Sequence, residues 1–287
     1  MRVAVVGANG QLASDLLPLL STHHTPIPLT HADCELRDHE AVRARLDRER
    51  PDVVINTAAF HRVDDCEQEV EAAFAVNAFG VLQLARWCAA HDATLIHFST
   101  DYVFAGDVAS PRSEADAAEP LSVYGASKLA GEHLVRQACP RHFVIRTCGL
   151  YGHAGSSGKG GNFVETMLRL GRAGKPIRVV HDQVLTPTAT ADLAPKVLQL
   201  LETTAFGLYH ITDAGACSWF EFAAAAFRLA GIVADLSPTT SAAFGAAARR
   251  PAYSVLRHDR LAALGLDDLP PWQDALACYL RGRPSSV

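Results

Sequence analysis

Short apolar runs alternate with longer segments of helical periodicity over most of this chain. The run RVAVVG (2–7) is followed by NGQLASDLLPLL, in which apolar residues recur at helical spacing. Further apolar runs occur at 51–59, 93–100, 142–147 and 177–180, and helical patterns such as 69–90 and 127–138 lie between most of them. This alternation predicts an α/β fold, a doubly wound parallel sheet with helices on both faces. We expect the segments 69–90 and 127–138 to cover one face.

A glycine-rich turn follows the first apolar run. GANGQLA (7–13) closes a predicted strand and opens a predicted helix. In that context backbone N–H groups and the helix dipole hold a pyrophosphate. Ala13 takes the third small position and still permits close helix packing. The turn therefore predicts a Rossmann-type sheet that binds a dinucleotide.

The pattern changes after residue 150. A Gly- and Ser-rich segment precedes the helical pattern at 163–174. Its GSSGKGG portion (155–161) is no P-loop, because His153 and Gly160 stand where that motif needs Gly and Ser or Thr, so we expect a flexible surface loop that closes over a substrate. The length of 287 residues allows one to two domains. We expect an NAD(P)-binding Rossmann domain over 1–150, with a later segment near 177–212 returning to it, and a mainly substrate-binding, smaller domain over 151–287.

Composition excludes several classes of protein. Apolar residues make up 49% and charged residues 20%, as in soluble globular proteins, and a net charge of -5 offers no basic face for nucleic acid. Asn9 and Asp15 interrupt the apolar run that a signal peptide needs, and no stretch approaches the roughly 18 apolar residues of a membrane span. Seven cysteines without a CxxC pair predict reduced thiols. The thirteen histidines, His31 and His61 among them, lack metal-ligand spacing and are predicted to be structural or on the surface. We expect a cytoplasmic protein with no nucleic-acid or membrane partner.

A tyrosine and a lysine lie one helical turn apart in LSVYGASK (121–128). HFSTDYVFAG (97–106) begins in a predicted strand and places Thr100 near its carboxyl end, which faces the ligand crevice in open α/β sheets. A nearby ammonium would bring the pKa of Tyr124 closer to working pH, and the Thr100 hydroxyl would orient the reacting oxygen. An isolated YxxxK occurs by chance on many amphipathic helices. Combined with the dinucleotide turn and the strand end, it predicts that Tyr124 and Lys128 form an acid/base unit.

Taken together, these motifs resemble the extended short-chain dehydrogenase/reductase superfamily, and more closely the dTDP-4-dehydrorhamnose reductase family. The similarity runs in order and nearly end to end through GANGQLA, NTAAFHRVDDCE, STDYVF, VYGASKLAGE, GGNFVETML, DQVLTPT and RRPAYSVL. By that resemblance Thr100, Tyr124 and Lys128 match the catalytic triad. The positions that match cofactor contacts are Gly7, Asn9, Gly10, Gln11, Leu12, Ala58, Ala59, Asn77, Tyr124 and Lys128.

The resemblance also implies where substrate binds. Contacts are expected at or near Val63, Asp101, Tyr102 and Asn162, and Arg250 is expected to pair with the phosphates of the substrate nucleotide. One position departs from the family, because RTCGLYG (146–152) has Gly149 where a tryptophan commonly forms a wall of the sugar site. Losing an aromatic wall widens the pocket or removes a stacking contact, which leaves the identity of the sugar open without affecting the hydride chemistry.

The activity that the resemblance implies is reduction of the C4 keto group of a nucleotide sugar, from dTDP-4-dehydro-L-rhamnose to dTDP-L-rhamnose. Either NADPH or NADH is expected, because PIPLTHADCELRD (26–38) has neither a clear ribose-binding acid nor a 2′-phosphate arginine. An epimerase or dehydratase of the same superfamily is one alternative. A non-catalytic binding subunit, resembling the regulatory subunit of methionine adenosyltransferase, is another. The intact Thr100, Tyr124 and Lys128 favour an enzyme.

The predicted chemistry needs no metal. In this family a magnesium ion sometimes bridges a homodimer through acidic side chains, and Asp15 and Asp192 are the candidates here, although no cluster in the sequence indicates a metal site.

Overall fold

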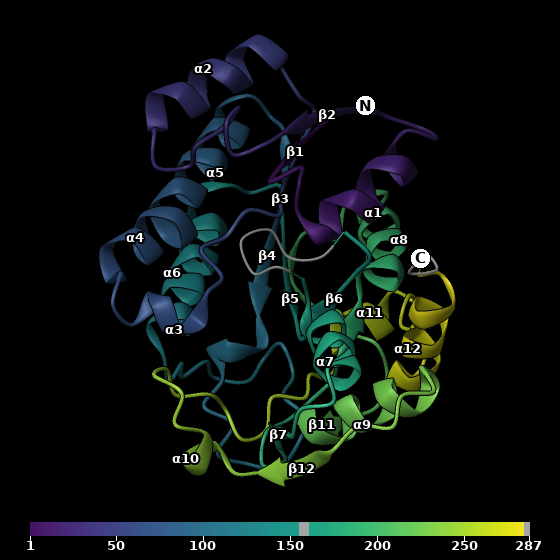
Figure 1. Cartoon of the computed structure of the whole chain (residues 1–287). Helices are drawn as coiled ribbons and strands as arrows, with labels where there is room; N and C mark the ends of the chain where they lie inside the picture. The colour runs from purple at the N-terminus through teal and green to yellow at the C-terminus, as the bar shows by residue number, and fades with distance from the viewer. Residues whose placement is uncertain (155–160, 284–287) are drawn as a thin grey trace.

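The computed structural model describes residues 1–154 and 161–283, so the surface loop predicted over 155–161 lies outside the described residues except for Gly161. Its centre is a six-stranded sheet in the order β10-β5-β4-β3-β1-β2, in which every pairing is parallel (Figure 1). The strands are β1 (Arg2–Val6), β2 (Thr25–Leu29), β3 (Val53–Asn56), β4 (Thr94–Thr100), β5 (His142–Thr147) and β10 (Gly207–His210). The predicted doubly wound parallel sheet is confirmed.

Helices cover both faces of this sheet, which is why β3 and β4 are buried along their whole length. On one face α1 (Gln11–Leu20), α8 (Thr190–Leu201) and α11 (Asp259–Ala263) pack on residues such as Val3 and Val5. On the other, α2 (His39–Glu49), α5 (Val81–Ala90) and α6 (Val123–Ala138) pack on Ala4 and Val6. As the sequence predicts, the helical segments at 69–90 and 127–138 cover the same face.

A separate apolar cluster lies beside the sheet and is built mainly from residues after 150. Aromatic rings fill it, including Tyr151, Phe222 and Trp272. Its elements are β6 (Leu150–Tyr151), α7 (Phe163–Arg172), β7 (Ile177–Val180), β8 (Val184–Leu185), β9 (Thr188–Ala189), β11 (Cys217–Ser218), α9 (Trp219–Leu229), β12 (Leu236–Thr239), α10 (Ser241–Phe244) and α12 (Trp272–Arg281). The division into domains at residue 150 stays a prediction.

The apolar run at 177–180 is not part of the central sheet. As β7 it pairs in parallel with β12, and the sixth strand of the central sheet is β10, which pairs with β5. The expectation that 177–180 adds to the central sheet is therefore wrong. A four-residue apolar run carries no local signal for its partner, which long-range packing decides.

One helical run is long and apolar enough to cross a membrane by length and composition alone. It joins α4 (Val70–Phe74), the π-helical turn η1 (Ala75–Gly80) and α5, and spans Val70–Ala90. Half of it is buried inside the fold, where Val81 and Leu84 belong to the apolar core beneath α2 and α6. We therefore interpret it as a core helix of this fold.

Candidate active site

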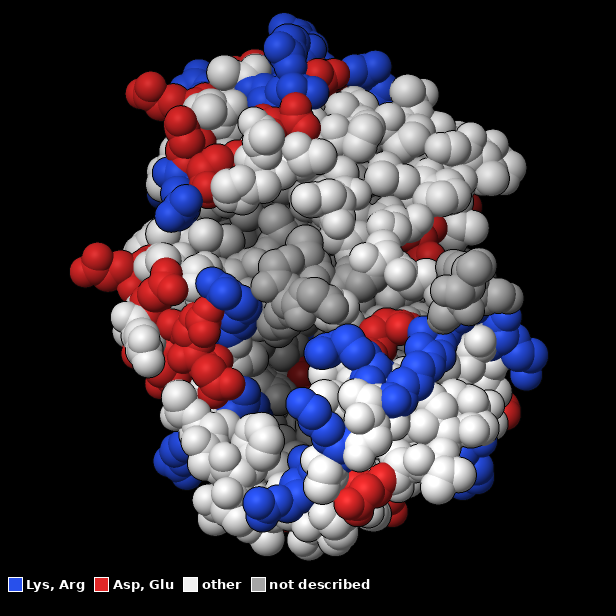
Figure 2. Space-filling model, viewed as in Figure 1, with Lys and Arg blue, Asp and Glu red and all other residues white. Residues whose placement is uncertain are grey.

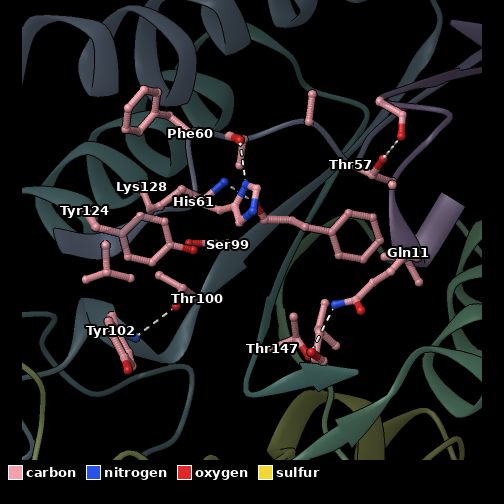
Figure 3. Close-up of a pocket in the computed structure, with 18 of the residues that line it drawn as sticks. Gln11, Thr57, Phe60, His61, Ser99, Thr100, Tyr102, Tyr124, Lys128 and Thr147 are labelled. Atoms are coloured by element: carbon pink, nitrogen blue, oxygen red, sulfur yellow. Dashed lines mark hydrogen bonds between the residues drawn. The ribbon is translucent and has the colours of Figure 1, made fainter. Parts of the chain in front are cut away.

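A cavity of about 990 Å³ opens at the carboxyl ends of β1, β3, β4 and β5. The strand order reverses between β1 and β3, and ligands bind at such a point in open α/β sheets. Tyr124 and Thr100 lie on one side of the space, and Gln11 and Thr57 lie across from them (Figure 3). Of the predicted site residues, the cavity is lined by Gly7, Asn9, Gly10, Gln11, Leu12, Ala58, Ala59, Val63, Thr100, Asp101, Tyr102, Tyr124, Lys128, Asn162 and Arg250.

The glycine-rich turn brings two backbone segments together at the end of β1. Gly7 has a φ of +81°, and a Cβ there would lie 2.9 Å from both the Ala58 nitrogen and the Thr57 Oγ1. Gly10 caps α1 without a side-chain hydrogen bond, so the first N–H groups of the helix point into the cavity mouth unsatisfied by a cap. Only glycine fits at position 7, and the turn forms the kind of cradle that holds a pyrophosphate.

Two buried oxygens in the cavity wall also fit a dinucleotide. The Gln11 amide donates to the Leu150 carbonyl at 3.0 Å, but its Oε1 has no partner. The Thr147 hydroxyl, at the end of β5, has none either. Buried polar atoms without partners are costly, so each would gain from a ligand that donates or accepts a hydrogen bond. The residues present therefore suit an NAD(P)-type cofactor.

Charged side chains in the segment after β2 also line the cavity. The sequence alone indicated no ligand-binding role for them. Glu35 accepts two hydrogen bonds from the Arg37 guanidinium, at 3.1 and 2.9 Å, and its Oε2 lies 2.7 Å from His31 Nε2. These contacts, mainly the hydrogen bonds from Arg37, lower the pKa of Glu35 to about 2. His31, whose side chain is 77% exposed, lines the cavity from the surface, and the half-buried His61 also lines it.

Tyr124 and Lys128 both lie near the start of α6. Ser122 caps this helix by accepting from the Gly125 N–H at 3.2 Å, which fixes its first turn beside the end of β4. The Lys128 ammonium is buried and donates to the Phe98 carbonyl at 2.6 Å. The Thr100 hydroxyl donates to Asp101 Oδ1 at 3.0 Å and accepts from the Tyr102 N–H at 3.2 Å. The structure thus brings the three predicted catalytic residues to one wall.

Burial dominates the protonation of this wall. It raises the pKa of the Tyr124 phenol well above its usual value, and the Thr100 hydroxyl offsets only part of that effect. It also lowers the pKa of Lys128 to about 8, which the Glu132 carboxylate partly opposes. The net pKa of Tyr124 is therefore raised in this structure and not lowered as expected, because desolvation outweighs the contacts that favour the phenolate. Tyr124 keeps its proton at neutral pH and is a proton donor.

A buried ion pair holds α6 against the sheet. The Glu132 carboxylate, one turn beyond Lys128, accepts from Arg146 on β5 at 2.9 and 2.7 Å. It also accepts from the Ser99 hydroxyl on β4 at 2.5 Å. All three residues are buried. This network links three elements directly behind the catalytic wall.

Asn77 does not line the cavity, in contrast to its predicted role as a cofactor contact. It is 1% exposed and lies in η1, where its side chain accepts from the Phe60 N–H at 2.9 Å and donates to the Phe60 carbonyl at 3.0 Å. Its amide also donates to the Ser127 hydroxyl at 3.0 Å. Asn77 therefore holds the Phe60 backbone in the cavity wall through these hydrogen bonds. Its own side chain is too deeply buried to contact a ligand.

The predicted substrate residues meet the cavity from separate parts of the chain. Arg250 forms a two-point ion pair with Asp64 on α3 (Val63–Cys66), at 3.1 and 2.7 Å, so part of its charge is already balanced. Asp101 lies next to the catalytic Thr100 and accepts from the Cys148 thiol at 2.9 Å. Burial raises the pKa of Asp101. Asn162 caps α7 and donates to the Gly152 carbonyl at 2.9 Å.

Gly149 lies in the cavity wall, and the position that a Cβ would occupy there is crowded. Its φ is +55°, and a Cβ there would lie 2.9 Å from Leu185 Cδ1, 3.2 Å from Pro187 Cα and 3.7 Å from the Trp219 ring. A side chain at this position would meet these neighbours at once, and the expected widening of the pocket or loss of a stacking contact stays a prediction.

Sequence reasoning did not single out several residues that line the cavity. Thr147 is the last residue of β5 and Cys148 follows it, so the rule that strand carboxyl ends face the crevice would have found both. Trp219 carried no such signal, because its place depends on the pairing of β11 with β8.

Asp15 and Asp192, the candidate magnesium ligands, lie close together. Asp15 Oδ2 accepts a hydrogen bond from Thr190 Oγ1 at 2.5 Å. The pKa of Asp192 is raised, mainly by burial and to a smaller extent by the nearby charge of Asp15. No group of three or more metal-ligating side chains occurs among residues 1–154 and 161–283.

Surface charge on the face shown in Figure 2 is uneven. Acidic side chains gather on its left side over α3 and α4, which carry Asp64, Asp65 and Glu71. Arg62 pairs with Asp65 at 2.8 Å within this acidic area.

Comparison with known proteins agrees with the geometry. The model of the RmlD substrate binding domain family matches residues 1–283. A dTDP-4-dehydrorhamnose reductase of Mycolicibacterium smegmatis is 41% identical over 96% of this chain and 84% of that protein. A dTDP-4-keto-6-deoxy-D-glucose reductase of Streptomyces niveus is 37% identical over 96% of this chain and 95% of that protein. The crystal structure of Bacillus anthracis dTDP-4-dehydrorhamnose reductase in complex with NADP has a TM-score of 0.93 at 37% identity and covers 98% of both chains. This chain therefore belongs to the dTDP-4-dehydrorhamnose reductase family, whose Rossmann-type fold it shares.

Proposed function

We propose that this chain uses NADPH or NADH to reduce the C4 keto group of a dTDP-linked 6-deoxy sugar, converting dTDP-4-dehydro-L-rhamnose to dTDP-L-rhamnose in the cytoplasm. One observation carries the proposal. The protonated Tyr124 hydroxyl and the glycine-rich turn at Gly7 open into the same cavity. A dinucleotide cradle and a proton donor in one site are what reduction of a carbonyl requires. The names of the relatives support the substrate class.

When bound, the nicotinamide supplies hydride to the C4 carbon. Tyr124 donates its phenolic proton to the C4 oxygen as that oxygen gains negative charge, which leaves a phenolate and a new C–OH group. The charged Lys128, which remains mostly protonated below its pKa of about 8, stabilises the phenolate. Thr100 orients the same oxygen once its hydroxyl turns from Asp101 toward the substrate.

A second sugar is a direct competitor for this role. The S. niveus relative is named for dTDP-4-keto-6-deoxy-D-glucose and is nearly as similar as the M. smegmatis relative. Both reductions use the same carbonyl chemistry, so the choice between them depends on the sugar subsite and not on Tyr124.

The test is to follow the absorbance of NADPH and of NADH with dTDP-4-dehydro-L-rhamnose and dTDP-4-keto-6-deoxy-D-glucose. We expect stoichiometric oxidation of the cofactor and the highest kcat/KM with the first sugar. A higher kcat/KM with the second would change the substrate but keep the reductase. Sugar isomerisation without net cofactor oxidation would identify an epimerase. A folded protein that binds NADPH but turns over neither sugar would favour the regulatory-subunit alternative.

The proposal includes a homodimer bridged by magnesium near Asp15 and Asp192. Light scattering with and without a chelator tests it, and Asp15→Asn should lower the dimer fraction. A monomer under all conditions would exclude it.

A further inference from the structure

The cavity wall beside Gly149 is completed by an aromatic ring from a distant part of the chain. Trp219 begins α9, seventy positions further along, and its Cη2 would lie 3.7 Å from a Cβ at Gly149. The indole is only partly buried and lines the same cavity as Tyr124. One side of the ring is therefore available to a ligand.

Several contacts hold this ring in place. The residue before it, Ser218, lies in β11, which pairs with β8, and Ser218 also forms a capping box with Glu221 at the start of α9. The indole packs on the Phe163 ring with centroids 4.6 Å apart at an interplanar angle of 48°. A ring fixed on one face by packing loses little conformational entropy when a ligand contacts the other.

A chain of contacts places Trp219 at the reacting end of the cavity. Gly149, which the ring approaches, follows Cys148. The Cys148 thiol donates to Asp101, which in turn accepts from the catalytic Thr100 hydroxyl. The charged residues His31, Glu35 and Arg37 line the part of the cavity that follows β2 and have no part in this chain of contacts. Trp219 is therefore beside the site of the carbonyl, where the sugar ring must lie.

From this arrangement we propose that Trp219 forms the aromatic wall of the sugar subsite and is a specificity-determining residue for the reduction. The inference rests on the proposed function and deepens it. The apolar C–H face of a 6-deoxy hexose, with its methyl group, would pack on the indole. Because Gly149 has no side chain, the indole can approach the backbone there and still line the cavity. A sugar with a polar group on that face would bind less well.

The experiment compares Trp219→Leu, Trp219→Phe and the matched control Phe220→Leu. Phe220 is the next residue of α9 and packs in the same apolar cluster, but it does not line the cavity. For the preferred dTDP-4-keto sugar, Trp219→Leu should raise KM roughly three- to tenfold, the range expected for one aromatic contact, with kcat little changed. Trp219→Phe should retain most of the affinity, and Phe220→Leu should behave as wild type. The Kd for NADPH should be the same in all four proteins.

A second readout does not depend on turnover. The sequence contains three tryptophans, all in the described part of the chain, and Trp87 and Trp272 are buried outside the cavity lining. The intrinsic fluorescence of wild type should therefore change when dTDP-L-rhamnose is added with saturating NADP⁺, and Trp219→Phe should lose that change.

Several results would overturn the inference. An unchanged KM in Trp219→Leu would do so, as would a weaker Kd for NADPH with the sugar KM unaltered, which would assign the ring to the cofactor. If the Leu variant does not fold, a wild-type fluorescence signal that dTDP-L-rhamnose leaves constant would refute it. Failure of the proposed function looks different, because wild type itself would then turn over none of the dTDP-4-keto sugars.

Discussion

Replacing Gly149 by alanine is expected to destabilise the protein by about 1–4.5 kcal/mol, although the change adds only a methyl group. Two effects contribute. The residue has a φ of +55°, where an L-residue costs roughly 1–2 kcal/mol. The new Cβ would also lie 2.9 Å from Leu185 Cδ1 and 3.2 Å from Pro187 Cα. The leucine methyl is the end of a flexible side chain, whereas the proline Cα is fixed in the backbone, so overpacking adds roughly 1–3 kcal/mol.

One opposing effect reduces this sum. Alanine restricts the unfolded chain more than glycine does, which favours the folded state by roughly 0.4–1 kcal/mol. A matched control separates the backbone effect from the clash. Gly231, just after α9, has a similar φ of +65° and nothing within 4 Å of its Cβ position. Gly231→Ala should therefore destabilise by only about 1 kcal/mol, the backbone effect less the unfolded-state gain.

Urea unfolding of wild type, Gly149→Ala and Gly231→Ala at one pH measures all three free energies of unfolding. The expected order is wild type, then Gly231→Ala, then Gly149→Ala. Equal losses for the two variants would refute the conclusion that the space at Gly149 is filled. The same reasoning predicts that a tryptophan at 149 damages the fold, because its larger side chain meets the same two neighbours.

Three further predictions test the catalytic wall and the cradle. Tyr124→Phe should lower kcat roughly 10²–10⁴-fold while leaving the Kd for NADPH unchanged, since only the proton donor is lost, and near-normal turnover would exclude Tyr124 as the acid. Gly10→Val should weaken NADPH binding roughly tenfold or more, because its Cβ would lie 3.1 Å from the Gly7 carbonyl and obstruct the approach to the pyrophosphate; fluorescence titration measures this, and an unchanged Kd would contradict it. Lys128→Met should stabilise the protein relative to wild type by up to about 3 kcal/mol more at pH 7 than at pH 11, because burial lowers the pKa of Lys128 to about 8 from 10.5. The unfolded state binds more protons between those values, so the cost of the buried charge is present below pH 8 and disappears as pH rises to 10.5; a stability difference that does not vary with pH would argue against a buried, charged Lys128.

Much of the sheet and of the site was predictable because its signals are local. The strand, glycine-rich turn and helix at the amino terminus are adjacent in sequence, so their order alone predicts a dinucleotide cradle. Tyr124 and Lys128 are one helical turn apart, and a helix necessarily places them on one side. Thr100 could be assigned because the carboxyl end of a parallel strand faces the crevice.

Only the tertiary structure decided the features that join distant segments. The run at 177–180 pairs with β12, which lies more than fifty residues further along the chain. The ion pair of Arg250 with Asp64 joins segments 186 positions apart. The Trp219 ring that approaches Gly149 comes from the start of α9, seventy positions further along the chain. The raised pKa of Tyr124 has the same origin, because desolvation depends on everything packed around a side chain and not on the residue four positions away. The sequence by itself determined the local geometry and chemistry of this protein, whereas the shape of its sugar subsite and the protonation of its catalytic wall arise from packing between segments that are far apart in the chain.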